Sequence, residues 1–322
     1  MSEKHATSSS LILKAQRRHV IQALGAASAL ATFPTVLSAQ AWTGRMLEYQ
    51  GISALGLPDQ RLSIWLPPGY DTSDKRYRVL YMHDAQNLFD PALSNFNKVW
   101  AADKAMLSYA ERNGRAPWII VGIWSPGEDR YRQYMPKPAY DEAGSELRSK
   151  MDAFGNGKPI VSDHYIGWIT ATLKPWVDAN LRTRAGPDDT AIIGSSMGGL
   201  ISLYAFLEYP DVFGRAGCVS THWPGIAPQV VGEVDPEMLR IWADMIESGL
   251  GPAGRRKIWF DHGDATLDAF YPPYQNVIDA TMGSTKDWYR GQHWESRFYP
   301  GAEHEENAWA ARLPEVLDWV LG

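Results

Sequence analysis

The stretch TAIIGSSMGGLISLYAFLEY, residues 190–209, decides the fold of this chain. Its first four residues form a short apolar run, which predicts a buried strand. From residue 197 onward, apolar residues recur at helical spacing and predict a helix that ends at residue 209. The string GSSMG, residues 194–198, lies between the two and forms a sharp strand-to-helix turn. We expect the glycines at both ends of this string to relieve the crowding around Ser196.

A serine in such a turn presents its hydroxyl above the ends of the strands. The free N–H groups and the positive dipole at the start of the following helix favour a negative charge that develops on a nearby oxygen. The G-x-S-x-G string is weak by itself, but the strand before it and the helix after it make it specific. Ser196 is therefore the candidate nucleophile.

The rest of the chain alternates between short β-rich runs and helical patterns. Strands are predicted at residues 62–66, 78–82, 118–124, 190–193, 216–220, 257–260 and 294–299. Helices are predicted at residues 99–112, 162–181, 197–209, 236–248 and 307–321. This alternation implies βαβ crossovers, and so one α/β domain with a mainly parallel sheet and helices on both faces.

Two further features of this pattern carry expectations. Pro175 and Pro314 fall inside helical patterns and should kink or divide those helices. The irregular stretch 125–159 is too long for a passive connection, so we expect it to cover the face where ligands bind.

Composition narrows the class of protein. Of the 322 residues, 45% are apolar and 21% are charged, which predicts a packed globule and excludes long disorder. The formal charge of −6 argues against nucleic acid as a partner. Cys218 is the single cysteine and no Cys/His cluster has zinc spacing, so neither a disulfide, a metal nor another cofactor is expected.

The first 41 residues have the layout of an export signal. A polar, basic segment ends in Arg17-Arg18, residues 20–37 are apolar and rich in alanine, and small residues precede a cleavage point before residue 42. The segment resembles a twin-arginine leader, with a general secretory signal as the alternative. The sequence therefore predicts an exported protein, periplasmic or secreted, without stable membrane insertion, whose mature part is a single domain at residues 42–322.

A serine nucleophile needs an imidazole base that a carboxylate orients. His304 lies directly after the last predicted strand and before the terminal helix, so its loop can return to the serine. His293, at the start of the same strand, should emerge at the opposite end of the sheet. His83 and His222 come too early in the chain for the usual position of the base.

Candidates for the carboxylate follow the strand predicted at 257–260. Asp264 comes directly after Gly263, and Asp268 comes four residues later; spacing alone does not choose between them. Either one gives the order Ser, Asp, His that is expected of the α/β-hydrolase architecture.

An oxyanion hole needs a donor from the loop after the third strand of that architecture. Here that loop follows the strand at 78–82, so the backbone N–H of Gln86 is the candidate, paired with the N–H of Met197. Ala85 is the alternative to Gln86.

Six segments together resemble the esterase D and enterochelin-esterase-like branch of the α/β-hydrolases. They are MHDAQNLFD (82–90), RYRQYMP (130–136), LKPWVD (173–178), IIGSSMGGLISLYAFLEYPDVFG (192–214), DHGDATLD (261–268) and GAEHEENAW (301–309). The similarity extends from about Gln60 to the C-terminus. That branch also contains feruloyl and acetylxylan esterases, formylglutathione hydrolases and mycolyltransferases.

The resemblance implies roles for particular residues. The family nucleophile falls on Ser196 and the family base on His304. The family acid often ends a glycine-turn motif in Leu-Asp, which matches Leu267-Asp268 and favours Asp268 over Asp264.

The resemblance also implies a serine carboxylic-ester hydrolase that acts on an acylated carbohydrate or plant-derived ester. A siderophore trilactone esterase and an acyltransferase on the same fold are the alternatives, and a binding protein without turnover is the competing class. Trp124 and Trp223 are candidates for stacking on a sugar or aromatic substrate. The sequence makes no prediction of oligomeric state.

Overall fold

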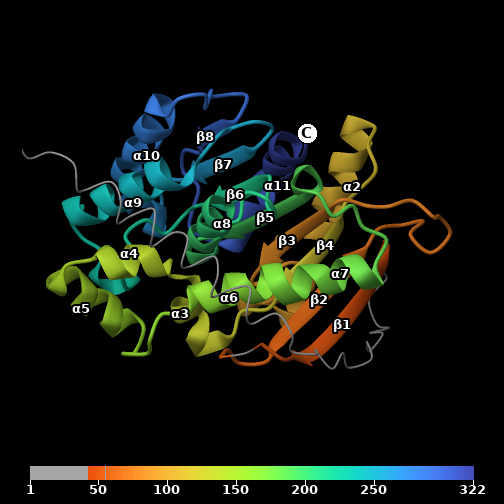
Figure 1. Cartoon of the computed structure of the whole chain (residues 1–322), viewed down its shortest axis with the longest axis horizontal. Coiled ribbons are helices and arrows are strands. Elements are labelled where there is room, and N and C mark those ends of the chain that lie inside the picture. Colours follow the sequence, from red (N-terminus) through yellow and green to blue (C-terminus); the bar gives the residue numbers. More distant parts are fainter. Residues whose placement is uncertain (1–42, 55) are drawn as a thin grey trace, which may run out of the picture.

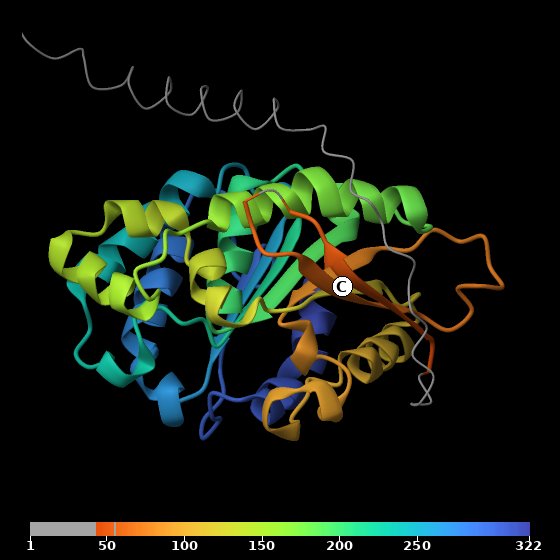
Figure 2. The ribbon, with the colours of Figure 1, turned by 90° about the horizontal axis from the view of Figure 1, so that it is seen from below.

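One eight-stranded sheet organises the protein, with strand order β1-β2-β4-β3-β5-β6-β7-β8. The computed structural model describes residues 43–54 and 56–322, so the predicted export signal lies outside the described residues. Helices cover both faces of the sheet, with α6 and α7 on one side and α2 and α11 on the other (Figures 1 and 2). Among the described residues, no helix combines the length and apolarity needed to cross a membrane.

The strands are β1 (Arg45–Ile52), β2 (Gln60–Leu66), β3 (Val79–His83), β4 (Ile119–Ile123), β5 (Thr190–Ser195), β6 (Arg215–Val219), β7 (Lys257–His262) and β8 (Trp294–Phe298). The helices are α2 (Ala102–Asn113), α3 (Arg130–Tyr134), α4 (Lys137–Glu142), α5 (Ser145–Phe154), α6 (Ser162–Trp168), α7 (Lys174–Asn180), α8 (Met197–Glu208), α9 (Pro236–Gly249), α10 (Pro272–Ser284) and α11 (Glu306–Leu321).

The pairing of the strands confirms a mainly parallel sheet. Neighbours from β4 through β3, β5, β6, β7 and β8 run parallel, whereas β1–β2 and β2–β4 are antiparallel. All seven predicted strands are present, to within three residues at their ends. The sequence missed β1, because Glu48 interrupts its apolar pattern. That carboxylate is buried and accepts a hydrogen bond from Arg61 at 3.4 Å.

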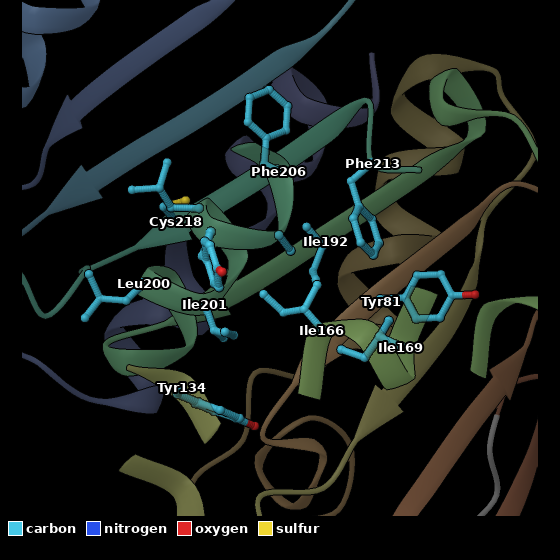
Figure 3. Packing of buried hydrophobic residues seen from close by; sticks show 14 of the residues in the cluster. Tyr81, Tyr134, Ile166, Ile169, Ile192, Leu200, Ile201, Phe206, Phe213 and Cys218 are labelled. Atoms are coloured by element: carbon cyan, nitrogen blue, oxygen red, sulfur yellow. The ribbon is translucent and has the colours of Figure 1, made fainter. Parts of the chain in front are cut away.

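Successive residues of β5 serve the two faces of the sheet, as the period of a strand requires. Ile192 packs in the cluster shared with α6 and α8, whereas Ala191 and Ile193 pack in the cluster shared with α2 and α11. Figure 3 shows Ile192 beside Ile166 of α6. Burial on both faces explains why the central strands are apolar throughout and cannot be recognised by alternation.

The two prolines behave differently. The predicted helix at 162–181 is divided into α6, a π-helical turn at Ile169–Leu173, and α7, whose first turn contains Pro175. Pro314, in contrast, lies within a continuous α11.

The stretch 125–159 is more regular than expected. It forms the short helices α3, α4 and α5, which lie beside the carboxyl ends of the strands (Figure 1). Helix α10 was also missed, since Pro272 and Pro273 at its start resemble a turn signal. Proline is well tolerated in the first turn of a helix.

Candidate active site

Ser196 lies at the strand-to-helix turn that the sequence predicts. Strand β5 ends at Ser195 and α8 begins at Met197. The backbone of Ser196 has φ 57° and ψ −124°, a conformation that costs about 1–3 kcal/mol for a residue with a side chain. Two hydrogen bonds join it to β6 and the loop that follows, from Ser196 N–H to the Val219 carbonyl at 3.0 Å and from His222 N–H to the Ser196 carbonyl at 3.2 Å.

The sequence predicts that Gly194 and Gly198 relieve crowding at this turn, but the structure shows close approach at Gly194 and Gly199. A Cβ on Gly194 would lie 2.5 Å from the Gly198 carbonyl oxygen, and one on Gly199 would lie 2.6 Å from Thr221 Oγ1. A Cβ on Gly198 would meet nothing closer than 3.4 Å, an ordinary contact. The expectation that Gly198 relieves crowding is therefore wrong: close approach of α8 to β6 and its following loop makes Gly199 the constrained position.

His304 is hydrogen-bonded to Asp268 rather than to Asp264. The distance from His304 Nδ1 to Asp268 Oδ1 is 2.6 Å. A carboxylate oxygen accepts, so Nδ1 donates in this bond, which leaves Nε2 as the ring nitrogen that can act as a base. The Asp264 carboxylate instead accepts from Gly301 N–H at 2.6 Å and closes the turn beside the His304 loop.

Three donors hold the buried Asp268 carboxylate. Besides His304, Ser220 Oγ and the Gly263 N–H each donate to Oδ2 at 2.6 Å. Burial acts to raise the pKa of Asp268, but the hydrogen bonds from His304, Ser220 and Gly263 outweigh it and bring the pKa below its usual range. The carboxylate is therefore charged at neutral pH.

An ion pair lies beneath this carboxylate. Arg312 Nη2 is 2.9 Å from Asp261 Oδ1 and also donates to Ser220 Oγ. Asp261 is fully buried and additionally accepts from Ser220 N–H and Trp259 Nε1. Arg312 thus positions Ser220, which positions Asp268.

Tyr271 lies between Ser196 and His304, and the sequence analysis did not identify it. The Ser196 side chain is within hydrogen-bonding range of the Tyr271 hydroxyl. The ring centroids of Tyr271 and His304 are 5.6 Å apart at an interplanar angle of 83°. Trp309 contacts the His304 ring in the same edge-on manner, with centroids 5.1 Å apart. The imidazole is therefore oriented by two aromatic rings as well as by Asp268.

His222 fixes the direction of the hydrogen bonds at Tyr271. His222 Nε2 is 2.7 Å from the Ile226 carbonyl oxygen, which can only accept, so Nε2 carries the proton. Burial lowers the pKa of His222 to about 4, so the ring is neutral and Nδ1 accepts from the Tyr271 hydroxyl at 2.8 Å. With its only proton committed to His222, the Tyr271 oxygen can only accept from Ser196. Within residues 56–322, no direct hydrogen bond joins Ser196 to His304; catalytic hydrogen bonds commonly tighten only when substrate is bound.

The two candidate oxyanion donors, Met197 and Gln86, lie just after the ends of the adjacent strands β5 and β3. Met197 is the first residue of α8, so its N–H has no acceptor one helical turn earlier. Gln86 lies in a 3-10 turn directly after β3, which pairs with β5. The hypothetical Cβ of Gly198 lies 3.4 Å from Asp84 Oδ2, so the start of α8 touches the start of this turn.

An Asp–Arg pair holds the turn that contains Gln86. Asp84 has φ 57°, and its carboxylate accepts from Arg130 Nε and Nη2, both at 2.8 Å. Arg130 Nη2 also lies 3.5 Å from the Ser195 carbonyl oxygen. The side chain of Gln86 accepts from Ser125 N–H at 3.1 Å. The segment RYRQYMP of the sequence resemblance thus supplies the arginine that joins the β3 turn to the end of β5.

A sequence profile with the description "Putative esterase" matches residues 58–320. The chain belongs to this esterase family. This membership confirms the similarity found in the six segments above. A curated relative of the esterase, YbbA of Bacillus subtilis (strain 168), is 29% identical over 167 residues. The match covers 51% of this chain and 58% of YbbA, so the chain spans less than two thirds of that relative.

Solved structures show the same fold as this esterase. An IroE-like serine hydrolase from Shewanella oneidensis has a TM-score of 0.60 at 17% identity, covering 85% of this chain and 79% of its own. A feruloyl esterase module from Clostridium thermocellum, complexed with sinapinate, gives 0.57 and 17%, with 92% and 96% covered. An enterobactin esterase from Shigella flexneri gives 0.56 and 14%, with 88% and 61% covered. At these identities the likeness establishes the α/β-hydrolase fold and nothing finer.

The two candidate stacking residues of the esterase are both occupied. Trp223 is completely buried and donates from Nε1 to Gln275 Oε1 at 3.0 Å, so it cannot meet a substrate. The guanidinium of Arg61 covers the Trp124 ring at 3.4 Å from its centroid, and Trp124 Nε1 donates to Ser63. Stacking by Trp223 is therefore excluded, because its indole fills the core under α9.

Two other histidines that the sequence analysis set aside lie where they cannot act as the base of Ser196. His293 precedes β8 at the amino end of the sheet, as predicted, and His83 is buried with Nδ1 2.9 Å from the Tyr165 hydroxyl. Burial lowers the pKa of His83 to about 4. Over the described part of the chain, no three His, Cys, Asp or Glu side chains are grouped so that they could hold a metal ion.

Proposed function

We propose that this esterase hydrolyses its ester through an acyl-enzyme formed on Ser196, with His304 as base and Asp268 as the acid that orients it. The observation that carries the proposal is the 2.6 Å hydrogen bond between His304 and Asp268 beside the strained turn of Ser196. In this arrangement the imidazole has the tautomer that a base requires.

The first half of the reaction forms the acyl-enzyme. The Ser196 hydroxyl turns from Tyr271 toward Nε2 of His304, transfers its proton there and bonds to the ester carbonyl carbon. The N–H groups of Met197 and Gln86 donate to the oxyanion that develops. Collapse of this intermediate breaks the carbon–oxygen bond, and His304 returns the proton to the departing alcohol.

The second half repeats these steps with water. His304 takes a proton from water, whose oxygen attacks the acyl carbon, and Ser196 leaves with the proton as the acid is released. Throughout, the Asp268 carboxylate stabilises the imidazolium form of His304, since its low pKa keeps it charged.

The decisive experiment pairs hydrolysis with covalent labelling. Ser196→Ala should reduce hydrolysis of a short-chain aryl ester by on the order of a thousandfold or more. A fluorophosphonate should form an adduct on Ser196, located by peptide mass spectrometry, and the adduct should persist in the neighbouring control Ser195→Ala. Undiminished turnover in Ser196→Ala, or labelling at another residue, would refute the mechanism.

For the substrate, we propose an ester of an acylated carbohydrate or a plant-derived hydroxycinnamate. The similarity to a feruloyl esterase module that binds sinapinate supports this choice. A siderophore trilactone is the second candidate, supported by the similarity to an enterobactin esterase. A panel of acetyl, feruloyl and trilactone esters at equal concentration separates them through kcat/KM. Added alcohols, with analysis of the products, distinguish hydrolysis from acyl transfer.

We also propose that residues 1–41 direct export. The motif Arg17-Arg18 before an apolar segment supports a twin-arginine route. Replacing both arginines by lysine should retain the protein in the cytoplasm if that route is used. Unchanged export of the double variant would indicate the general secretory route instead.

A further inference from the structure

A cavity lies at the amino ends of the parallel strands, at the opposite end of the sheet from Ser196. Its volume is about 400 Å³, within the range of small-molecule sites. Six guanidinium groups line it: Arg76, Arg78, Arg115, Arg184, Arg215 and Arg255.

The topology explains why these arginines meet. Arg115 precedes β4, Arg78 precedes β3, Arg184 precedes β5, Arg215 begins β6 and Arg255 precedes β7. These five strands are consecutive neighbours in the sheet and all run parallel. Their amino ends therefore share one edge, and residues far apart in the sequence form one cationic cluster.

The acidic partners of the cluster do not balance it. Arg78 Nε is 2.7 Å from Asp189 Oδ1, and Arg184 Nη1 is 3.8 Å from the same oxygen. Arg255 Nε is 3.3 Å from Asp188 Oδ2. In the part of the chain that the structure describes, these two aspartates are the acidic side chains paired with the six arginines. The cluster is strongly cationic although the whole chain carries a formal charge of −6.

Three arginines of the cluster also donate hydrogen bonds to backbone carbonyls. Arg215 Nη1 donates to the Val320 carbonyl at 2.6 Å, and Arg115 Nη1 lies 3.4 Å from the Leu321 carbonyl, so both stabilise the negative end of α11. Arg76 donates to the Thr183 carbonyl at 3.1 Å. Each guanidinium has five N–H donors, so these bonds leave most of them for water or a ligand.

Repulsion within the cluster is visible at its buried member. Burial lowers the pKa of Arg215, the positive charges of Arg78 and Arg255 lower it further, and Asp188 and Tyr109 act to raise it. The pKa of Lys257, which begins β7, is lowered by burial and then by Arg215 and Arg115. An anion in the cavity would remove this repulsion.

We propose that this cavity binds a multivalent oxyanion of the phosphate type, carried by a small molecule or by a lipid headgroup. Guanidinium groups match phosphate oxygens with two parallel hydrogen bonds, which lysine cannot do. A cluster with arginines from five strands can contact several oxyanions at once. The site is separate from the ester site and does not depend on the proposed reaction.

Titration of the full chain with sodium tripolyphosphate at constant ionic strength tests the proposal. Isothermal titration calorimetry should show saturable binding with one site per chain. The double variant Arg184→Gln/Arg255→Gln should bind at least tenfold more weakly; their side chains are 53% and 79% exposed, so the fold tolerates the change. The control Arg240→Gln removes an arginine on α9 that is 51% exposed, about as much as Arg184, and should bind as the unmodified chain does.

Co-sedimentation with vesicles identifies the source of the oxyanion. Retention on phosphatidylglycerol-containing vesicles, absent with phosphatidylcholine alone and released by tripolyphosphate, supports a headgroup. Tripolyphosphate binding without retention on vesicles supports a free ligand. Absence of both, or equal affinity in the double variant and the control, overturns the proposal. Thermal unfolding of each variant without ligand verifies that it is folded.

Discussion

The two ends of the sheet are built from opposite arrangements of charge. At the carboxyl end three buried acidic side chains each have one basic partner within hydrogen-bonding distance. The pairs are Asp84–Arg130 at 2.8 Å, Asp261–Arg312 at 2.9 Å and Asp268–His304 at 2.6 Å. At the amino end, among the described residues, three of the six arginines are paired with an acidic side chain, Arg78 and Arg184 with Asp189 and Arg255 with Asp188.

This difference indicates what each end is suited to bind. At the carboxyl end each buried carboxylate is held by fixed hydrogen-bond donors, so the polar groups there are fixed in direction and suit an ester whose charge develops only during the proposed reaction. An unbalanced set has lower free energy when an external anion is present. Four experiments test this difference between the two ends of the sheet, and the one with the greatest predicted change comes first.

The strongest test concerns the Asp268–His304 pair. Asp268→Asn removes the charge that stabilises the His304 imidazolium and favours the wrong tautomer, so kcat/KM should fall by on the order of a thousandfold or more. The matched control Asp264→Asn disturbs only the bond to Gly301 N–H and should change kcat/KM by no more than about threefold. Steady-state kinetics on one aryl ester compares them. Equal losses would show that the acid is wrongly assigned.

The second test uses the two buried histidines near the site. The pKa values of His83 and His222 fall from 6.5 to about 4 in the folded protein. Below pH 6.5 these histidines bind protons in the unfolded chain but stay neutral in the folded protein. The free energy of unfolding therefore decreases as the pH is lowered from 6.5 to about 4. The loss should reach roughly 3 kcal/mol per histidine by pH 4, measured by urea unfolding. His222→Asn should show a shallower decrease between pH 6.5 and 5, and an unchanged slope would contradict a neutral buried His222.

The third test removes the hydroxyl of Tyr271. Tyr271→Phe leaves the buried Nδ1 of His222 without its donor, which should lower the free energy of unfolding by about 1–3 kcal/mol. Because Ser196 can then turn to His304, fluorophosphonate labelling should persist. Tyr274→Phe is the matched control, since its hydroxyl only accepts from Asp235 N–H. Loss of labelling in Tyr271→Phe would assign the hydroxyl a direct part in the chemistry.

The smallest effect is expected at the amino end. Arg255 is 79% exposed and its ion pair with Asp188 contributes little, so Arg255→Gln should change the free energy of unfolding by less than about 1 kcal/mol. Chemical denaturation in low salt measures it. A loss of several kcal/mol would mean that the cluster stabilises the fold, and that its charge is not held in surplus for a ligand.

Much of the fold was predictable because it follows from local patterns. Apolar runs identified the seven strands that follow β1, and the alternation of strands with helices identified a mainly parallel sheet. The chain order of Ser196, an aspartate at 264 or 268, and His304 was likewise available from the string GSSMG and the loops after β7 and β8. The strand β1 was missed because a buried Glu48 breaks its pattern, and its partner Arg61 lies on another strand.

The parts of the site that were missed share a physical cause. Tyr271, His222, Ser220 and Arg312 have no distinctive spacing in the sequence, and each matters only through hydrogen bonds to residues on other elements. Gly199 rather than Gly198 is constrained because Thr221, which follows β6, approaches α8 there.

Local sequence patterns were enough to predict the class of fold, the turn around Ser196 and the set of candidate polar residues. These features depend on contacts between near neighbours in the chain. The three-dimensional arrangement was needed to show that His304 is hydrogen-bonded to Asp268 and not to Asp264. It was also needed to show that six arginines near the amino ends of five strands lie at one edge of the sheet. Both outcomes depend on the order and direction of strands in the sheet, which brings together residues that no local pattern relates.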